Sequence, residues 1–90
     1  MITIHKYLLN HEGVTTIFVS ENCAFLKVDT QGAETVAWVE VDTEAEFTNV
    51  NVVGYYTGAE ISDEVHGEGM YLGTTTKNGL VSHFYAVAMA

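Results

Sequence analysis

Carboxylates occupy every second position from Glu40 to Glu46, and no other residues of this 90-residue chain have a more regular spacing that could do chemistry. Side chains two positions apart on a β-strand share a face and lie about 6.7 Å apart. Glu40 and Asp42 would then match the carboxyl pair of an inverting glycosidase. Any two acids at this spacing would match, however, and catalysis also needs a cleft that raises one pKa. We therefore interpret the carboxylates as a solvated, negatively charged strand face.

The histidines and the cysteine form no recognisable site. His66 lies near Asp63, Glu64 and Glu68 in one predicted loop, but the spacing fits neither a zinc helix nor a calcium loop. Cys23 is the single cysteine, so it cannot form an internal disulfide, and a pairing of Cys23 with a histidine lacks a third orienting residue and a set of oxyanion donors. We expect no metal, no cofactor and no enzymatic activity.

The aromatic residues suggest a contact surface rather than a reaction. Trp38 stands among valines in the most apolar segment, which favours a place in the core. Tyr55 and Tyr56 follow Gly54 and must face opposite ways on a strand. One of them is expected in the core, and the other at an exposed rim, where tyrosine often anchors an interface.

The charge balance restricts the class of partner. Three basic residues, all lysine, against twelve acids give a net charge of −9. Binding to nucleic acid through phosphates is disfavoured, because that mode needs clustered cations. A protein with a basic surface is the natural complement, and the alternative is that the charge only keeps the chain soluble.

The apolar content predicts self-association. Hydrophobic residues make up 48% of a chain too short to bury all of them, so we expect a second copy or a partner to cover the remainder. The start of the sequence resembles no export signal, and no run of residues is apolar enough to cross a membrane. These features favour the cytosol.

The acidic alternation needs a strand to position it, and the segment from Thr35 to Phe47 is predicted to be that central strand. Its first half is apolar on both faces, as in a covered strand, and its second half is acidic on one face. The row on that face would be Glu40, Asp42, Glu44 and Glu46.

Period-two alternation predicts further strands over residues 1–9, 14–20, 24–30 and 47–57. Leu26 and Val28 should point inward. Gly54 should mark a bulge or a close backbone approach. Residues 58–69 are predicted to form a long mobile loop with at most one helical turn, capped by Ser62.

Asn78-Gly79 predicts a two-residue type I′ hairpin between residues 70–77 and 80–87. The predicted pairs are Thr76–Val81, Thr74–His83, Gly73–Phe84, Leu72–Tyr85 and Met70–Val87, with the last two pairs facing the central strand and the Phe84 ring over Gly73. Together, the elements predict one all-β domain over residues 1–90. It would be a small antiparallel sandwich or open barrel of six to seven strands.

Several short segments resemble a family of small uncharacterised bacteriophage proteins. They are IHKYLL at Ile4–Leu9, FLKV at Phe25–Val28, AWVEVD at Ala37–Asp42, TGAEI at Thr57–Ile61, YLGT at Tyr71–Thr74 and VSHFY at Val81–Tyr85. The resemblance implies a phage gene product in the host bacterial cytoplasm. It implies no activity.

The sequence therefore predicts a non-enzymatic phage accessory protein that binds and modulates a host protein, such as a defence or nucleic-acid enzyme. The predicted partner-binding residues are Glu40, Asp42, Glu44, Glu46, Tyr55, Tyr56, Glu60, Asp63, Glu64 and Glu68. Two alternatives stay open: a structural or assembly component of the virion, and a small-ligand binder with Tyr55, Tyr56 and residues 58–69 around a pocket.

Overall fold

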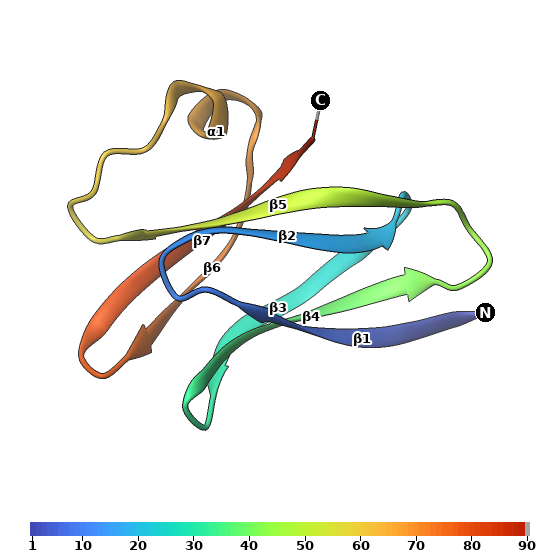
Figure 1. Ribbon diagram of the computed structural model, residues 1–90, viewed down its shortest axis with the longest axis horizontal. Coiled ribbons are helices and arrows are strands. Elements are labelled where there is room, and N and C mark those ends of the chain that lie inside the picture. Colours follow the sequence, from blue (N-terminus) through green and yellow to red (C-terminus); the bar gives the residue numbers. More distant parts are fainter. Residues whose placement is uncertain (90) are drawn as a thin grey trace.

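The computed structural model describes residues 1–89 as seven strands and one short helix in two antiparallel sheets (Figure 1). The predicted all-β sandwich is confirmed. The elements are β1 (Ile2–Leu9), β2 (Gly13–Ser20), β3 (Ala24–Gln31), β4 (Glu34–Asp42), β5 (Phe47–Tyr56), α1 (Asp63–Glu68), β6 (Met70–Lys77) and β7 (Leu80–Ala88).

The core lies between a three-stranded sheet of order β1-β4-β3 and a four-stranded sheet of order β2-β5-β7-β6. As predicted, β4 is a central strand, with Ala37, Val39 and Val41 turned inward and fully buried. The four-stranded sheet contributes mainly valine, isoleucine and the ring of Phe84. Trp38, expected in the core, is half-buried on the outer face of β4, because the alternation places it opposite the inward valines.

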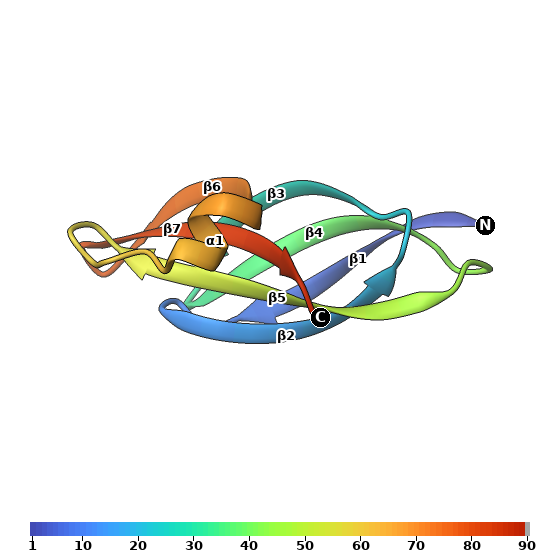
Figure 2. The ribbon, with the colours of Figure 1, turned by 90° about the horizontal axis from the view of Figure 1, so that it is seen from above.

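Hydrogen bonds tie the two sheets together along both sides of the sandwich, and Figure 2 shows β3 beside β6 on one of these sides. On one side, the hydroxyls of Thr30 in β3 and Thr75 in β6 are 2.8 Å apart, and Thr30 also donates to the Thr76 carbonyl at 3.0 Å. On the other side, the Tyr7 hydroxyl of β1 donates to the Phe18 carbonyl of β2 at 2.7 Å. Hydrogen bonds between side chains and backbone thus span the gap between strands that share no ladder.

The predicted central strand is too long at its acidic end. β4 stops at Asp42, whose side-chain oxygen Oδ1 accepts a hydrogen bond from the Glu44 N–H at 3.0 Å, while its carbonyl accepts one from the Ala45 N–H at 3.2 Å. Aspartate favours turns by this kind of local bonding. Glu44 and Glu46 therefore lie in the turn before β5, and the row of four carboxylates on one strand face was a wrong prediction.

The hairpin is confirmed in its turn and its first pairs. Asn78 and Gly79 have φ values of 51° and 80°, as a type I′ turn requires. Beyond the Gly73–Phe84 pair, a bulge at Leu72 shifts the register, so that Tyr71 pairs with Tyr85.

The bulge also changes which residues of the hairpin face the core. The predicted pairs Leu72–Tyr85 and Met70–Val87 are wrong, since Met70 pairs with Ala86. Tyr85 and Val87 lie on the outer face, while Phe84 turns inward. The Phe84 ring packs on Gly54 rather than on Gly73, which confirms the close approach predicted at Gly54.

A second bulge reverses one prediction in β3. The register slips between Phe25 and Lys27, so Leu26, expected inside, is 50% exposed, while Val28 is buried as predicted. The bulge leaves Leu26 unpaired, so the alternation has one phase up to Phe25 and the other phase from Lys27 onward, and both Phe25 and Val28 face the core.

Residues 63–68 form α1 in place of the predicted loop. The Ser62 side chain accepts a hydrogen bond from the Val65 N–H, which confirms Ser62 as the cap. Val65 is buried against Val53 and Val87, so the helix covers part of the outer face of the four-stranded sheet.

Candidate functional site

Three tyrosines and a histidine meet on the outer face of the four-stranded sheet. Tyr55 of β5 is paired with His83 of β7, and Tyr85 of β7 is paired with Tyr71 of β6. The rings of Tyr55 and Tyr85 are 6.2 Å apart and those of Tyr71 and Tyr85 are 5.4 Å apart, both in edge-on contact. We call these four residues the tyrosine-histidine face.

Hydrogen bonds fix the imidazole of this face on both sides. His83 Nε2 is 2.7 Å from the Thr57 hydroxyl, and Nδ1 is 2.9 Å from the Thr74 hydroxyl. The Thr74 hydroxyl also contacts the hydroxyl of Tyr71. Because a hydroxyl can both donate and accept, either neutral tautomer of His83 satisfies this arrangement. The face is therefore a preorganised surface that offers aromatic area and hydrogen-bonding groups.

The helix α1 places carboxylates along the edge of this face. Its buried Val65 packs beside Tyr55 and Tyr85, and Ile61 joins the same cluster. The four acids of this region, all exposed, are Glu60, Asp63, Glu64 and Glu68. An aromatic centre with a charged rim is the usual anatomy of a protein interface. The structure thus places Tyr55 beside α1, the helix that carries Asp63, Glu64 and Glu68, and Glu60 lies in the segment before this helix.

The other predicted residues lie elsewhere. Glu40 and Asp42 lie on the outer face of the three-stranded sheet, and Glu44 and Glu46 lie in the turn between β4 and β5, away from α1 (Figure 1). Tyr56 faces inward, with its ring 5.8 Å from that of His11. The ten residues therefore do not form one surface.

Asp42 and Glu44, two of the four acids predicted to form one row, form ion pairs with the ammonium group of Met1. The Met1 ammonium lies 2.6 Å from Glu44 Oε2 and 3.5 Å from Asp42 Oδ1. The hydrogen bond to Glu44 raises the pKa of that ammonium. The hydrogen bond from the Glu44 N–H lowers the pKa of Asp42, and the ammonium lowers it further.

These shifts predict how the contact depends on pH. A carboxyl with a lowered pKa stabilises the fold above its unfolded pKa, near 3.8, and loses that effect as the pH falls through the folded value. An ammonium with a raised pKa stabilises below 8.0 and loses that effect as the pH rises through the folded value. The contact should be strongest between these limits. Glu44→Gln should lower the pKa of the Met1 amine in an NMR titration, and an unchanged pKa would contradict the assignment.

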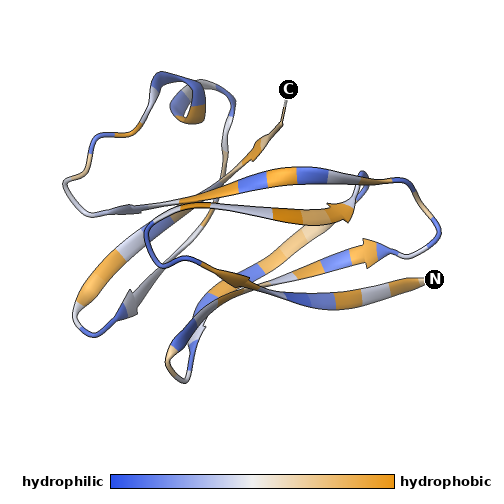
Figure 3. Ribbon diagram, in the orientation of Figure 1, coloured by the Kyte–Doolittle hydropathy of each residue, from blue (hydrophilic) through white to orange (hydrophobic). Residues whose placement is uncertain are grey.

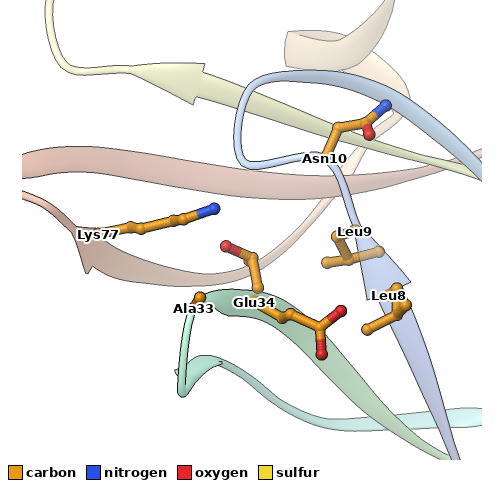
Figure 4. Close-up of a pocket in the computed structure, with 7 residues that line it drawn as sticks. Leu8, Leu9, Asn10, Ala33, Glu34 and Lys77 are labelled. Atoms are coloured by element: carbon orange, nitrogen blue, oxygen red, sulfur yellow. The ribbon is translucent and has the colours of Figure 1, made fainter.

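A pocket of about 280 Å³ lies at the other end of β1, lined by Leu8, Leu9, Asn10, Ala33, Glu34, Thr35 and Lys77 (Figure 4). Lys77 extends into it from the hairpin, and the Glu34 carboxylate points toward Leu8. Neither Tyr55 nor Tyr56 lines this pocket, and these two tyrosines face opposite sides of their sheet. The predicted ligand pocket around both tyrosines is therefore not found at this cavity.

Other reactive groups have structural surroundings. Cys23 is partly buried against the core, and this burial raises the pKa of its thiol, so the reactive thiolate is disfavoured. Within residues 1–89, no three His, Cys, Asp or Glu side chains are grouped to hold a metal ion. None of the helices described there is long and apolar enough to cross a membrane.

Sequence reasoning missed Tyr71, His83 and Tyr85 as members of the site. The spacing of His83 and Tyr85 along β7 could have shown that these two side chains lie on the same face, because strand residues two apart share a face. The bulge at Leu72 concealed it, since without the bulge Tyr85 is assigned to the core.

Comparison with known proteins gives a family but no function. No curated protein and no solved structure matches the chain. One family model, described as a domain of unknown function, matches residues 1–90. The chain therefore belongs to the family of the domain of unknown function DUF7352.

Proposed function

We propose that this protein is a non-enzymatic accessory protein that binds and modulates another protein through the tyrosine-histidine face and its acidic rim. The observation that supports this most is the contact of Tyr85 with both Tyr55 and Tyr71, beside the helix α1 that carries exposed carboxylates. Tyrosine supplies large contact area at low entropic cost, and it is enriched among the residues that dominate binding energy.

The charge of the chain defines the chemistry of the partner. With a net charge of −9, the protein attracts basic surfaces over distances of about one Debye length. The rim carboxylates would meet lysine or arginine side chains around an apolar patch that accepts Tyr71, which is 55% exposed. The partner we propose is a host protein with such a patch.

The biological setting rests on the resemblance of segments such as IHKYLL and VSHFY to small phage proteins. On that basis, we place the protein in the cytoplasm of an infected bacterium. There, a protein with a basic nucleic-acid groove is a suitable target. The acids at Glu40, Asp42, Glu44 and Glu46 have less support as a phosphate mimic, because the strand ends before the last two.

The proposal predicts a position-specific effect of charge reversal. Glu64→Lys with Glu68→Lys should reduce capture of a partner from host lysate at least about tenfold, because each substitution replaces an attraction with a repulsion. Capture by the wild type should also weaken as salt is added. The measurement is quantitative mass spectrometry of retained proteins.

The matched control reverses the same number of charges away from the site. Glu12 and Glu21 are exposed acids in other turns, and Glu12→Lys with Glu21→Lys changes the net charge equally. This variant should retain the partner. Equal retention by both variants, or equal loss by both, would contradict the proposed site.

A further inference from the structure

One of the four sheet edges lacks the protection that the other three have. The edge strands are β1 and β3 of one sheet and β2 and β6 of the other. β3 and β6 are both bulged, and they cover each other through the hydrogen bonds of Thr30. On β2, the Asn10 amide donates to the Val14 carbonyl at 3.1 Å and the Tyr7 hydroxyl donates to the Phe18 carbonyl at 2.7 Å.

The remaining edge, β1, is regular, and its outer face is apolar except for Lys6. Its register with β4 runs without interruption from Ile2 to Leu9. Ile2, Ile4 and Leu8 share its outer face and are 58%, 56% and 55% exposed, and Figure 3 shows hydrophobic bands along this strand. A long, unbulged and mostly apolar edge strand is a template for pairing with another chain.

The charges on the three-stranded sheet indicate which kind of partner chain can pair with the β1 edge. Two of the three basic residues of the protein, Lys6 and Lys27, lie on the outer face of the three-stranded sheet, and the register places them on either side of Trp38. The same face carries the acids Asp29, Glu34, Glu40 and Asp42, and Lys27 is paired with Asp29 at 3.0 Å. A chain of net charge −9 meets a second copy with least repulsion where its own cations lie. This face is therefore mixed in charge, whereas a basic partner would be favoured by surfaces that carry acids alone.

We infer that β1 pairs antiparallel with β1 of a second copy of this chain about a two-fold axis. The two three-stranded sheets then join into one continuous sheet of order β3-β4-β1-β1-β4-β3. The exposed backbone groups of each β1 edge pair with those of the other, as in other strand additions. The tyrosine-histidine face lies on the other sheet, so this inference is independent of the proposed function.

The side chains select one register. A two-fold axis at His5 sets Ile2 of each copy opposite Leu8 of the other. It also sets Ile4 of each copy opposite Lys6 of the other. An axis at Lys6 would set two ammonium groups directly opposite each other, which is unfavourable. An axis at Ile4 would leave Leu8 unpaired. The apolar side chains of the outer face are best matched with the axis at His5.

The first test compares two exposed β-branched residues on neighbouring edges. Sedimentation equilibrium near neutral pH should give the mass of two chains for the wild type at about 100 µM. Ile4→Lys should raise the dimer dissociation constant at least about tenfold, because it adds a charge to the paired edge. Val14→Lys, at a site of nearly equal exposure (54% against 56%) on β2, should leave the constant unchanged. A monomeric wild type, or the same effect of both substitutions, would overturn the inference.

Cross-linking tests the register even if Ile4→Lys folds poorly. In a Cys23→Ser background, His5→Cys should form an interchain disulfide under mild oxidation, because residue 5 faces its copy across the axis within disulfide range. Leu8→Cys should not, since its copy lies about 20 Å away along the strand. Cross-linking of both variants, or of Leu8→Cys alone, would overturn the register, and failure of both would overturn the pairing.

Salt separates this inference from the proposed function. Two chains of like charge repel, so the dimer should become tighter as salt screens them. Capture of a basic partner should weaken under the same change. A dimer that weakens with salt would contradict pairing between two acidic chains, whatever the outcome of the capture experiment.

Discussion

Replacing Phe84 with alanine is expected to lower the free energy of unfolding by about 3–5 kcal/mol. The side chain is fully buried in the main core cluster, between inward residues of both sheets. Its removal forfeits the burial of the ring and leaves a cavity that the strands cannot close. Domains of this size have total stabilities of about 5–15 kcal/mol, so the loss is a large share. Urea unfolding followed by circular dichroism measures it, with an unchanged denaturant slope as evidence that the same fold unfolds.

Phe18→Ala is the matched control for this effect. Phe18 lies on the outer face of β2, 57% exposed, and its ring contacts that of Phe47 at 5.4 Å. The same atoms are removed, but less than half of their surface is buried, so we expect a loss of at most about 1 kcal/mol. Equal losses for Phe84→Ala and Phe18→Ala would contradict the assignment of Phe84 to the centre of the core.

The alternation of residue types was enough to predict the strands and the all-β class. Strands with a two-residue period, separated by turn residues, gave the all-β class, and Asn78-Gly79 set the hairpin turn. What alternation could not supply was the position of the two bulges at Leu26 and Leu72. A bulge depends on how a strand must bend to meet its neighbours in three dimensions. One extra residue changes the phase of the alternation. Leu26 was wrongly placed inside because it is itself the extra residue, and Tyr85 was wrongly placed in the core because the bulge on β6 sets Tyr71 rather than Leu72 opposite it.

The acidic segment shows a different limit of sequence reasoning. Glu40 to Glu46 alternates as a strand does, but Asp42 bonds to the N–H of Glu44 and ends the strand. A local hydrogen bond of this kind competes with the ladder and leaves no mark in the hydropathy pattern. Tyr55 and the acids of residues 60–68 were recognised from composition. The position of this segment beside Tyr55 and Tyr85 depends on the packing of Val65, which cannot be predicted from a single sequence.

The second large effect is expected at Gly54, where a side chain has no room. A Cβ at this position would lie 2.7 Å from Phe84 Cε1 and 3.0 Å from the His11 carbonyl oxygen. The Phe84 ring is fully buried and cannot yield without disturbing both sheets. Gly54→Ala should therefore lower the free energy of unfolding by about 1–3 kcal/mol through overpacking. Gly67→Ala is the control, because nothing lies within 4 Å of that position in α1, and alanine there should add about 0.5–1 kcal/mol.

A double-mutant cycle attributes the cost at Gly54 to its cause. If the Phe84 ring is what blocks the added methyl group, Gly54→Ala should cost clearly less in a Phe84→Ala background than in the wild type, because the methyl group then enters the cavity left by the ring. The His11 carbonyl remains in both backgrounds, so part of the cost should persist. An equal cost in both backgrounds would assign the constraint to the backbone of the β1–β2 turn. In that case, the packing of the ring on Gly54 would not be what makes glycine necessary at this point of β5.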